Sequence, residues 1–220
     1  MYKLKHIVQY DVRFVVFATT IALLLVGCSG AMPASSWPNS IIADNNLIIA
    51  NNNAVYAISS DIGRLIWKFP SEPDSIRSQL YTSPAHTNNS IVVGSDNKHA
   101  FTIVITNGNE IWSFDATNNK SGTAPTGTSA SEDLAFFTSE NTLYALQISN
   151  GQTAWKFESA KELWAPPSAN GKYVFLPGMD HTLTSIDITN GSQIWQQNFK
   201  GALADSPTIY QDTLYTGSLS

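Results

Sequence analysis

One eleven-residue pattern recurs four times in this 220-residue chain, and it limits the fold more than any other feature. The copies cover residues 57–67, 102–112, 145–155 and 185–195, and in each a glycine stands four residues before a tryptophan. These pairs are Gly63 and Trp67, Gly108 and Trp112, Gly151 and Trp155, and Gly191 and Trp195. A proline recurs with the same period and precedes each tryptophan by 28–30 residues. These prolines are Pro38, Pro84, Pro125 and Pro166. Such a period predicts a fold built from like units.

Each unit is predicted to contain four short strands. The first follows the proline, the third precedes the glycine, and the fourth carries the tryptophan. The second is an apolar run at 47–50, 91–94, 134–137 and 173–176. Asn-Gly pairs at 107–108, 150–151 and 190–191 tolerate positive φ and so favour hairpins. No sustained helical period follows residue 27, so this part is expected to be all-β.

Four strands in a repeat of about 40–45 residues is typical of a β-propeller blade. A single blade cannot bury both of its faces, so neighbouring blades stack. A tryptophan suits that contact, since it offers a large apolar ring and one N–H donor. A β-sandwich with regularly spaced tryptophans is the alternative.

A fifth unit begins near the end of the sequence. Pro207 repeats the marker proline, and a second strand is expected at 214–217. The spacing places the next tryptophan near position 236, beyond Ser220. The repeat count therefore predicts an incomplete propeller of four repeats and the start of a fifth. Closure of a propeller protects its strand edges. A longer gene product or a partner chain would then complete it.

The N-terminal 27 residues have the pattern of an export signal. Lys3, Lys5 and Arg13 precede an uncharged apolar stretch at 14–27, which fits a signal-peptide core and is short for a membrane span. Cys28, the one cysteine, closes this stretch and excludes an intrachain disulfide. A soluble secreted protein and an uncleaved anchor are the alternatives.

The predicted domains are a signal peptide at 1–27, Cys28 with a flexible tether at 28–38, and propeller repeats at 39–220. Without residues 1–27 the net charge changes from −5 to −7, and no basic stripe remains. Nucleic acid is therefore not an expected partner.

These residues carry two resemblances. Leu25-Val26-Gly27-Cys28 resembles the lipobox of bacterial lipoproteins, which implies acylation of Cys28 and anchoring in a membrane. The resemblance implies a location at the periplasmic face of an outer membrane or the extracytoplasmic face of a plasma membrane. The repeats at 38–220 resemble the tryptophan-docking motif of propellers of the pyrroloquinoline quinone (PQQ) type. The motif's aspartate is matched only at Asp187, and the threonine before glycine is replaced in all four copies.

The resemblance leads to two families of different function. Quinoprotein dehydrogenases bind PQQ with Ca²⁺ and typically carry a vicinal disulfide, which a single cysteine cannot form. Lipoproteins similar to BamB, of the outer-membrane β-barrel assembly machinery, combine a lipobox with repeats that hold no PQQ. The second plan implies a non-enzymatic scaffold without cofactor that binds envelope or membrane proteins. A divergent quinoprotein enzyme, a PQQ-binding protein and a sensory ectodomain are the alternatives.

Few residues suggest chemistry. His86, His99 and His181 are isolated from other metal-ligating residues in the sequence. The carboxylate-bearing loops at Asp96-Asn97 and Asp180-His181 match no calcium loop, so catalytic and metal sites are not predicted. Trp164 stands outside the repeat on an expected loop. It is either a partner-binding anchor or a packing residue.

Overall fold

The computed structural model describes residues 40–51, 53–77, 79–80, 82–117 and 126–219. The predicted signal peptide, Cys28 and the tether therefore lie outside the described residues. Within them, no helix is both long and apolar enough to span a bilayer.

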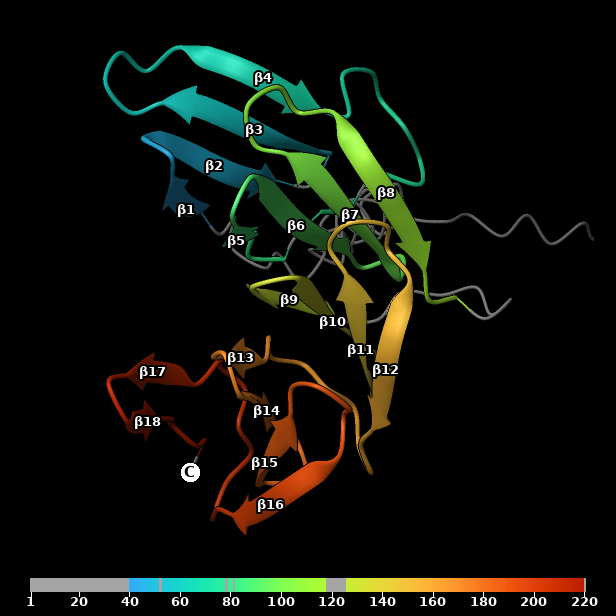
Figure 1. Ribbon diagram of the computed structural model, residues 1–220, viewed down its shortest axis with the longest axis vertical. Helices are drawn as coiled ribbons and strands as arrows, with labels where there is room; N and C mark the ends of the chain where they lie inside the picture. Colours follow the sequence, from blue (N-terminus) through green and yellow to red (C-terminus); the bar gives the residue numbers. More distant parts are fainter. Residues whose placement is uncertain (1–39, 52, 78, 81, 118–125, 220) are drawn as a thin grey trace, which may run out of the picture. The chain divides into compact units, whose positions relative to one another are not determined.

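The described residues form antiparallel sheets in chain order (Figure 1). The first sheet comprises β1 (Ser40–Ala43), β2 (Asn46–Asn51), β3 (Ala54–Ser59) and β4 (Leu65–Phe69). The second comprises β5 (Ala85–Thr87), β6 (Ser90–Ser95), β7 (His99–Val104) and β8 (Glu110–Asp115). The third comprises β9 (Thr126–Ser131), β10 (Leu134–Ser139), β11 (Thr142–Gln147) and β12 (Thr153–Glu158). The fourth comprises β13 (Ser168–Ala169), β14 (Tyr173–Pro177), β15 (Thr182–Asp187) and β16 (Gln193–Asn198). Strands β17 (Thr208–Tyr210) and β18 (Thr213–Tyr215) form a two-stranded sheet.

Consecutive sheets pack face to face, and the second strand of each shows how. Side chains on a strand point alternately to its two faces. In β10, Phe136 belongs to the core shared with the fourth sheet, whereas Ala135 and Phe137 belong to the core shared with the second. The same alternation occurs in β6 and β14. The second, third and fourth sheets are thus blades whose inner strands are buried on both faces, which confirms the propeller and not the sandwich.

The glycine turns between third and fourth strands are longer than two-residue hairpins. Strand β7 ends at Val104, and five residues separate it from Glu110, where β8 begins. Gly108 donates its N–H to Val104 O at 2.9 Å, so residues 104–108 form one helical turn. Gly108 then reverses the chain direction with φ +74°. The side chain of Asn107 accepts the N–H of Asn109 at 3.0 Å and fixes the turn. Asn150 and Asn190 do the same in the next two blades.

The first strand of each blade begins one or two residues after the marker proline. Pro84, Pro125 and Pro207 stand immediately before the first strand of their blades. In the fourth blade that place belongs to Pro167, because β13 begins at Ser168, and not to Pro166.

Candidate functional site

Three of the four repeated tryptophans, Trp67, Trp112 and Trp155, each lie on the glycine turn of the following blade. Trp67 is 7% exposed and donates its indole N–H to Ile105 O at 2.7 Å. Trp112 donates to Ile148 O, and Trp155 to Ile188 O, at 2.7 and 2.8 Å. In every case the acceptor stands three residues before the turn glycine. One side chain therefore supplies both an apolar contact and a hydrogen bond between blades.

The turn glycines are needed for this contact as well as for the backbone. A Cβ at Gly108, Gly151 or Gly191 would come within 2.7–2.9 Å of the docked indole. Gly63, at φ +65°, has nothing within 4 Å of that position. Trp195 is 41% exposed, and its ring lies 6.0 Å from that of Phe175. The three internal junctions between blades are thus built alike. Among the described residues, Gly63 has no tryptophan docked on it, and Trp195 is not docked on a glycine turn.

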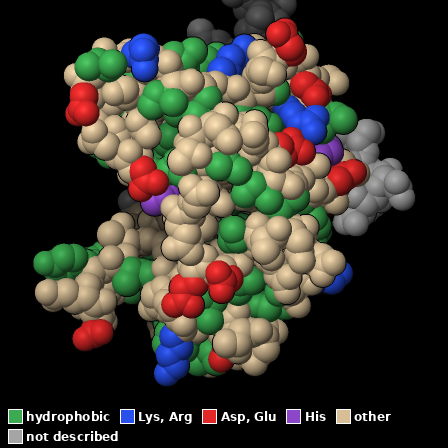
Figure 2. All heavy atoms as spheres, turned by 45° about the horizontal axis from the view of Figure 1, so that its top comes forward, with side chains coloured by type: hydrophobic (Ala, Val, Ile, Leu, Met, Phe, Trp, Pro, Cys, Tyr) green, Lys and Arg blue, Asp and Glu red, His purple; other side chains and the backbone are tan. Residues whose placement is uncertain are grey.

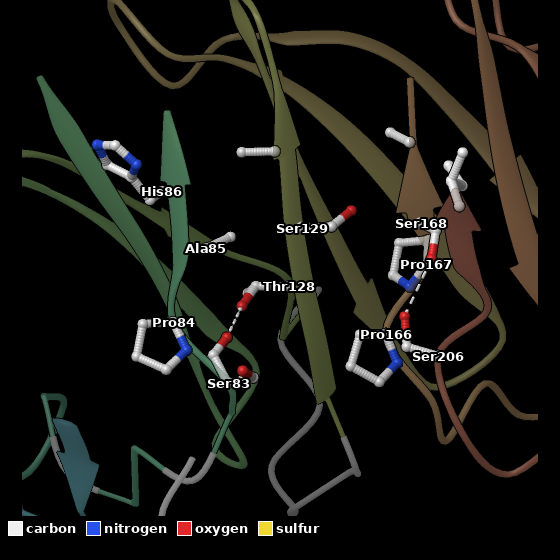
Figure 3. A pocket seen from close by; sticks show the side chains of 13 residues that line it. Ser83, Pro84, Ala85, His86, Thr128, Ser129, Pro166, Pro167, Ser168 and Ser206 are labelled. Atoms are coloured by element: carbon white, nitrogen blue, oxygen red, sulfur yellow. Dashed lines mark hydrogen bonds between the residues drawn. The ribbon is translucent and has the colours of Figure 1, made fainter. Parts of the chain in front are cut away.

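The inner strands are joined across blades by hydroxyl groups. Thr128 donates to Ser83 O at 2.7 Å, and Ser168 donates to Pro207 O and lies 3.2 Å from the Ser206 hydroxyl (Figure 3). These contacts place the edges of four first strands side by side. The sequence reasoning missed them because serine and threonine beside a proline look like ordinary turn residues.

A cleft of about 410 Å³ opens between these strands (Figure 3). Its described lining consists of Ser83, Pro84, Ala85, His86, Thr128, Ser129, Ala130, Pro166, Pro167, Ser168, Ala169, Ser206 and Ile209. The Ser129 hydroxyl is buried and lacks a hydrogen-bond partner among the described residues. His86 engages Asn88 O through Nε2 at 3.0 Å. The cleft offers neutral hydrogen-bonding groups and one imidazole, and no charged side chain lines it within the described part.

Trp164 lies on the loop between β12 and β13, where it is 50% exposed. Its indole N–H is 3.0 Å from the Glu162 carboxylate. The neighbouring Leu163 is buried and donates its backbone N–H to Glu140 O at 2.7 Å. Leu80 and Leu203, four residues before Pro84 and Pro207, are also fully buried. Trp164 therefore follows the leucine of a Leu-x-x-x-Pro spacing that two other loops share.

Ion pairs occur between two turns of neighbouring blades and between the β4–β5 loop and strand β8. The Lys98 ammonium, with only 4% of its side chain exposed, lies 2.7 Å from Glu140 in the next blade. Arg77 bridges Asp74 and Glu110, both at 2.6 Å, and these two carboxylates raise the pKa of the guanidinium. Hydrogen bonds from Ile76 N–H and Arg77 lower the pKa of Asp74. Because its charge is already matched, Arg77 is unsuited to capturing an anion.

Among the described residues, the histidines and the acidic residues noted in the sequence do not gather into one site, and His99 is the first residue of strand β7. His99 engages Asn97 O at 2.9 Å, and Asp180 accepts hydrogen bonds from Thr182. Burial raises the pKa of Asp96. No cluster of three metal-ligating side chains exists among the described residues.

A model of the family described as outer membrane protein assembly factor BamB matches residues 29–162 and 139–218. The chain belongs to this family.

Solved structures support the same fold. BamB from Moraxella catarrhalis superposes with a TM-score of 0.67 at 16% identity, over 84% of this chain and 59% of that protein. A quinohemoprotein alcohol dehydrogenase from Pseudomonas putida HK5 gives 0.63 at 13% identity, over 80% of this chain and 37% of that one. Tetrathionate hydrolase from Acidithiobacillus ferrooxidans is 25% identical over 164 residues, 73% of this chain and 28% of that protein. The chain thus spans less than two thirds of each relative.

The repeats resemble those of PQQ-type propellers, so the lining of the cleft can be compared with the chemistry of PQQ. PQQ is a tricarboxylate, so its binding calls for cations. The described residues that line the cleft include no Lys or Arg. This lining does not fit PQQ.

Proposed function

We propose that this chain is a membrane-tethered, non-enzymatic protein-binding module of the cell envelope that takes part in outer-membrane protein assembly. The family match supports the setting. The observation that carries the binding role is Trp164, a half-exposed aromatic side chain on a loop that is held from both sides.

The geometry of this loop favours binding. Interface hot spots are enriched in tryptophan, and affinity improves when the binding groups are ordered beforehand. Glu162 orients the indole, and buried Leu163 anchors the loop on Glu140 O. The surface seen in Figure 2 is mostly uncharged, with Lys and Arg scattered. Such a surface suits a protein partner better than a polyanion.

Capture from detergent-solubilised envelopes tests this role. The tagged full chain should retain an envelope protein identifiable by mass spectrometry, and Trp164→Ala should lose it. Ile62→Ala is the matched control, since Ile62 is 69% exposed on a turn of the first blade. If both variants retain the same proteins as the parent, Trp164 is not the anchor.

An enzymatic role is the alternative, favoured by the 25% identity to tetrathionate hydrolase. We propose that the chain works without PQQ, because the described lining of the cleft lacks cations for a tricarboxylate. Purified protein given PQQ, Ca²⁺, a dye acceptor and alcohols or sugars should not reduce the dye. Turnover that requires PQQ would refute the scaffold and favour the enzyme.

A further inference from the structure

The four blades of four strands each end in an outer strand that carries the tryptophan, and these strands differ in charge. Charged residues are Lys68 in β4, Glu110 and Asp115 in β8, and Lys156 and Glu158 in β12. Strand β16 reads Gln-Ile-Trp-Gln-Gln-Asn and has none. It also contains neither proline nor glycine.

This difference matters because an edge strand presents unpaired backbone N–H and C=O groups to any extended chain. Proteins suppress such pairing with charges, especially lysine, or with proline. All six residues of β16 are exposed. Ile194 is 49% exposed, similar to Ile66 at 43% and Ile111 at 40% in the same position of earlier blades. The exposure of Ile194 is therefore a property of the outer strand itself.

We infer that β16 is a docking edge at which an extended, uncharged segment of another protein adds as a fifth strand of the fourth blade. Main-chain hydrogen bonds supply the contact in this mode of recognition, and alternate side chains supply selectivity. Opposite Ile194, Gln196 and their neighbours, a charged side chain would find no counter-ion on the strand, so neutral segments are preferred. The inference rests on the proposed protein-binding function and names the class of partner.

A second copy of the chain fits this edge less well. Two copies would meet only along the six residues of β16, whereas stable interfaces bury roughly 1,200 Å² or more and draw on about 20–30 residues a side. A flexible segment can follow the twist of the sheet and contact both of its faces. The edge therefore favours an unfolded or extended partner.

A single charge provides the test. Gln196 follows Trp195, as Lys68 and Lys156 follow the tryptophans of β4 and β12, so Gln196→Lys places a lysine where the fold already accepts one. Ser113→Lys is the matched control, since it adds the same charge at the same position of β8. The probe is a capped, fluorescent ten-residue peptide of alternating valine and threonine, titrated into the full chain in detergent. We expect Gln196→Lys to weaken peptide binding about tenfold or more and Ser113→Lys to leave it unchanged. The peptide should also slow amide hydrogen exchange in β16.

Each other outcome counts against the inference. Equal binding by the parent and Gln196→Lys, or no binding, would overturn it. So would dimerisation in sedimentation that Gln196→Lys abolishes, because the occupant would then be a second copy. Trp164→Ala should leave the peptide affinity unchanged. A failure at β16 with Trp164-dependent capture intact would overturn this inference alone, and the reverse result would overturn only the role of Trp164.

Discussion

Trp155 and Gly191 are matched across the junction of the third and fourth blades. The indole lies so close to the turn that a Cβ at position 191 would stand 2.7 Å from ring carbon Cε3. The same glycine has φ +75°, a conformation that strains other residues. Packing and backbone therefore demand glycine here for two separate reasons, and these can be measured apart.

Gly191→Ala should lower the free energy of unfolding more than Gly63→Ala does. Left-handed backbone costs a residue with a Cβ about 1–2 kcal/mol, and overpacking adds about 1–3 kcal/mol. Gly63 shares the backbone conformation but has nothing within 4 Å of its added Cβ, so only the first cost applies. Urea unfolding of both variants checks this. Equal losses would show that the indole simply moves aside.

Truncation of Trp155 should destabilise the chain far more than truncation of Trp164. Trp155 is 9% exposed and hydrogen-bonded to Ile188 O, so Trp155→Ala should cost about 3–5 kcal/mol. Trp155→Phe keeps most of the ring but leaves the carbonyl unpaired, at a cost of about 1–3 kcal/mol. Trp164→Ala should cost under about 1 kcal/mol because the ring is half in solvent. Thermal melts that rank Trp164→Ala as the most damaging would reverse the assignment.

The pair of Lys98 and Glu140 predicts an asymmetry. Glu140→Gln leaves a buried ammonium without its carboxylate and should cost about 2 kcal/mol. Lys98→Met removes the buried charge itself and should cost less. The double variant should then be more stable than Glu140→Gln alone. Chemical denaturation of the three variants gives the comparison, and a double variant that loses the sum of the single costs would contradict it.

The anchor predicts where the protein is found in the cell. If Cys28 is acylated, the full chain partitions into membranes, and Cys28→Ala either releases it or leaves it unprocessed. Fractionation and gel mobility of the two forms report this. Identical membrane retention and mobility would contradict acylation of Cys28.

The sequence contained enough to predict the blades, because their signals are local. Alternating apolar runs and the glycine turns lie within a few residues of each other, and the apolar run predicted at 47–50 lies within β2. Strand β18 is shifted from the predicted 214–217 to Thr213–Tyr215. Boundaries of short strands depend on pairing partners, which periodicity does not describe.

The contacts between blades were harder to predict. Lys98 and Glu140 are separated by 42 positions and lie in equivalent turns, so only alignment of the turns could have paired them. The hydroxyl contact of Thr128 with Ser83 O is of the same kind. The charge difference among the outer strands, in contrast, was present in the aligned repeats and could have been found by comparing the full sequences of the four tryptophan-bearing strands.

The direction of the tryptophan contacts has a consequence for synthesis of the chain. Trp67 finds its place on Ile105 O and Gly108, residues that leave the ribosome after it. Until that turn emerges, the indole of Trp67 in the finished first blade is exposed to solvent. The same delay recurs for Trp112 and Trp155. Each blade is thus completed by its successor. Nascent chains halted within a blade expose one such tryptophan, so chaperone demand should rise and fall with the period of the repeat.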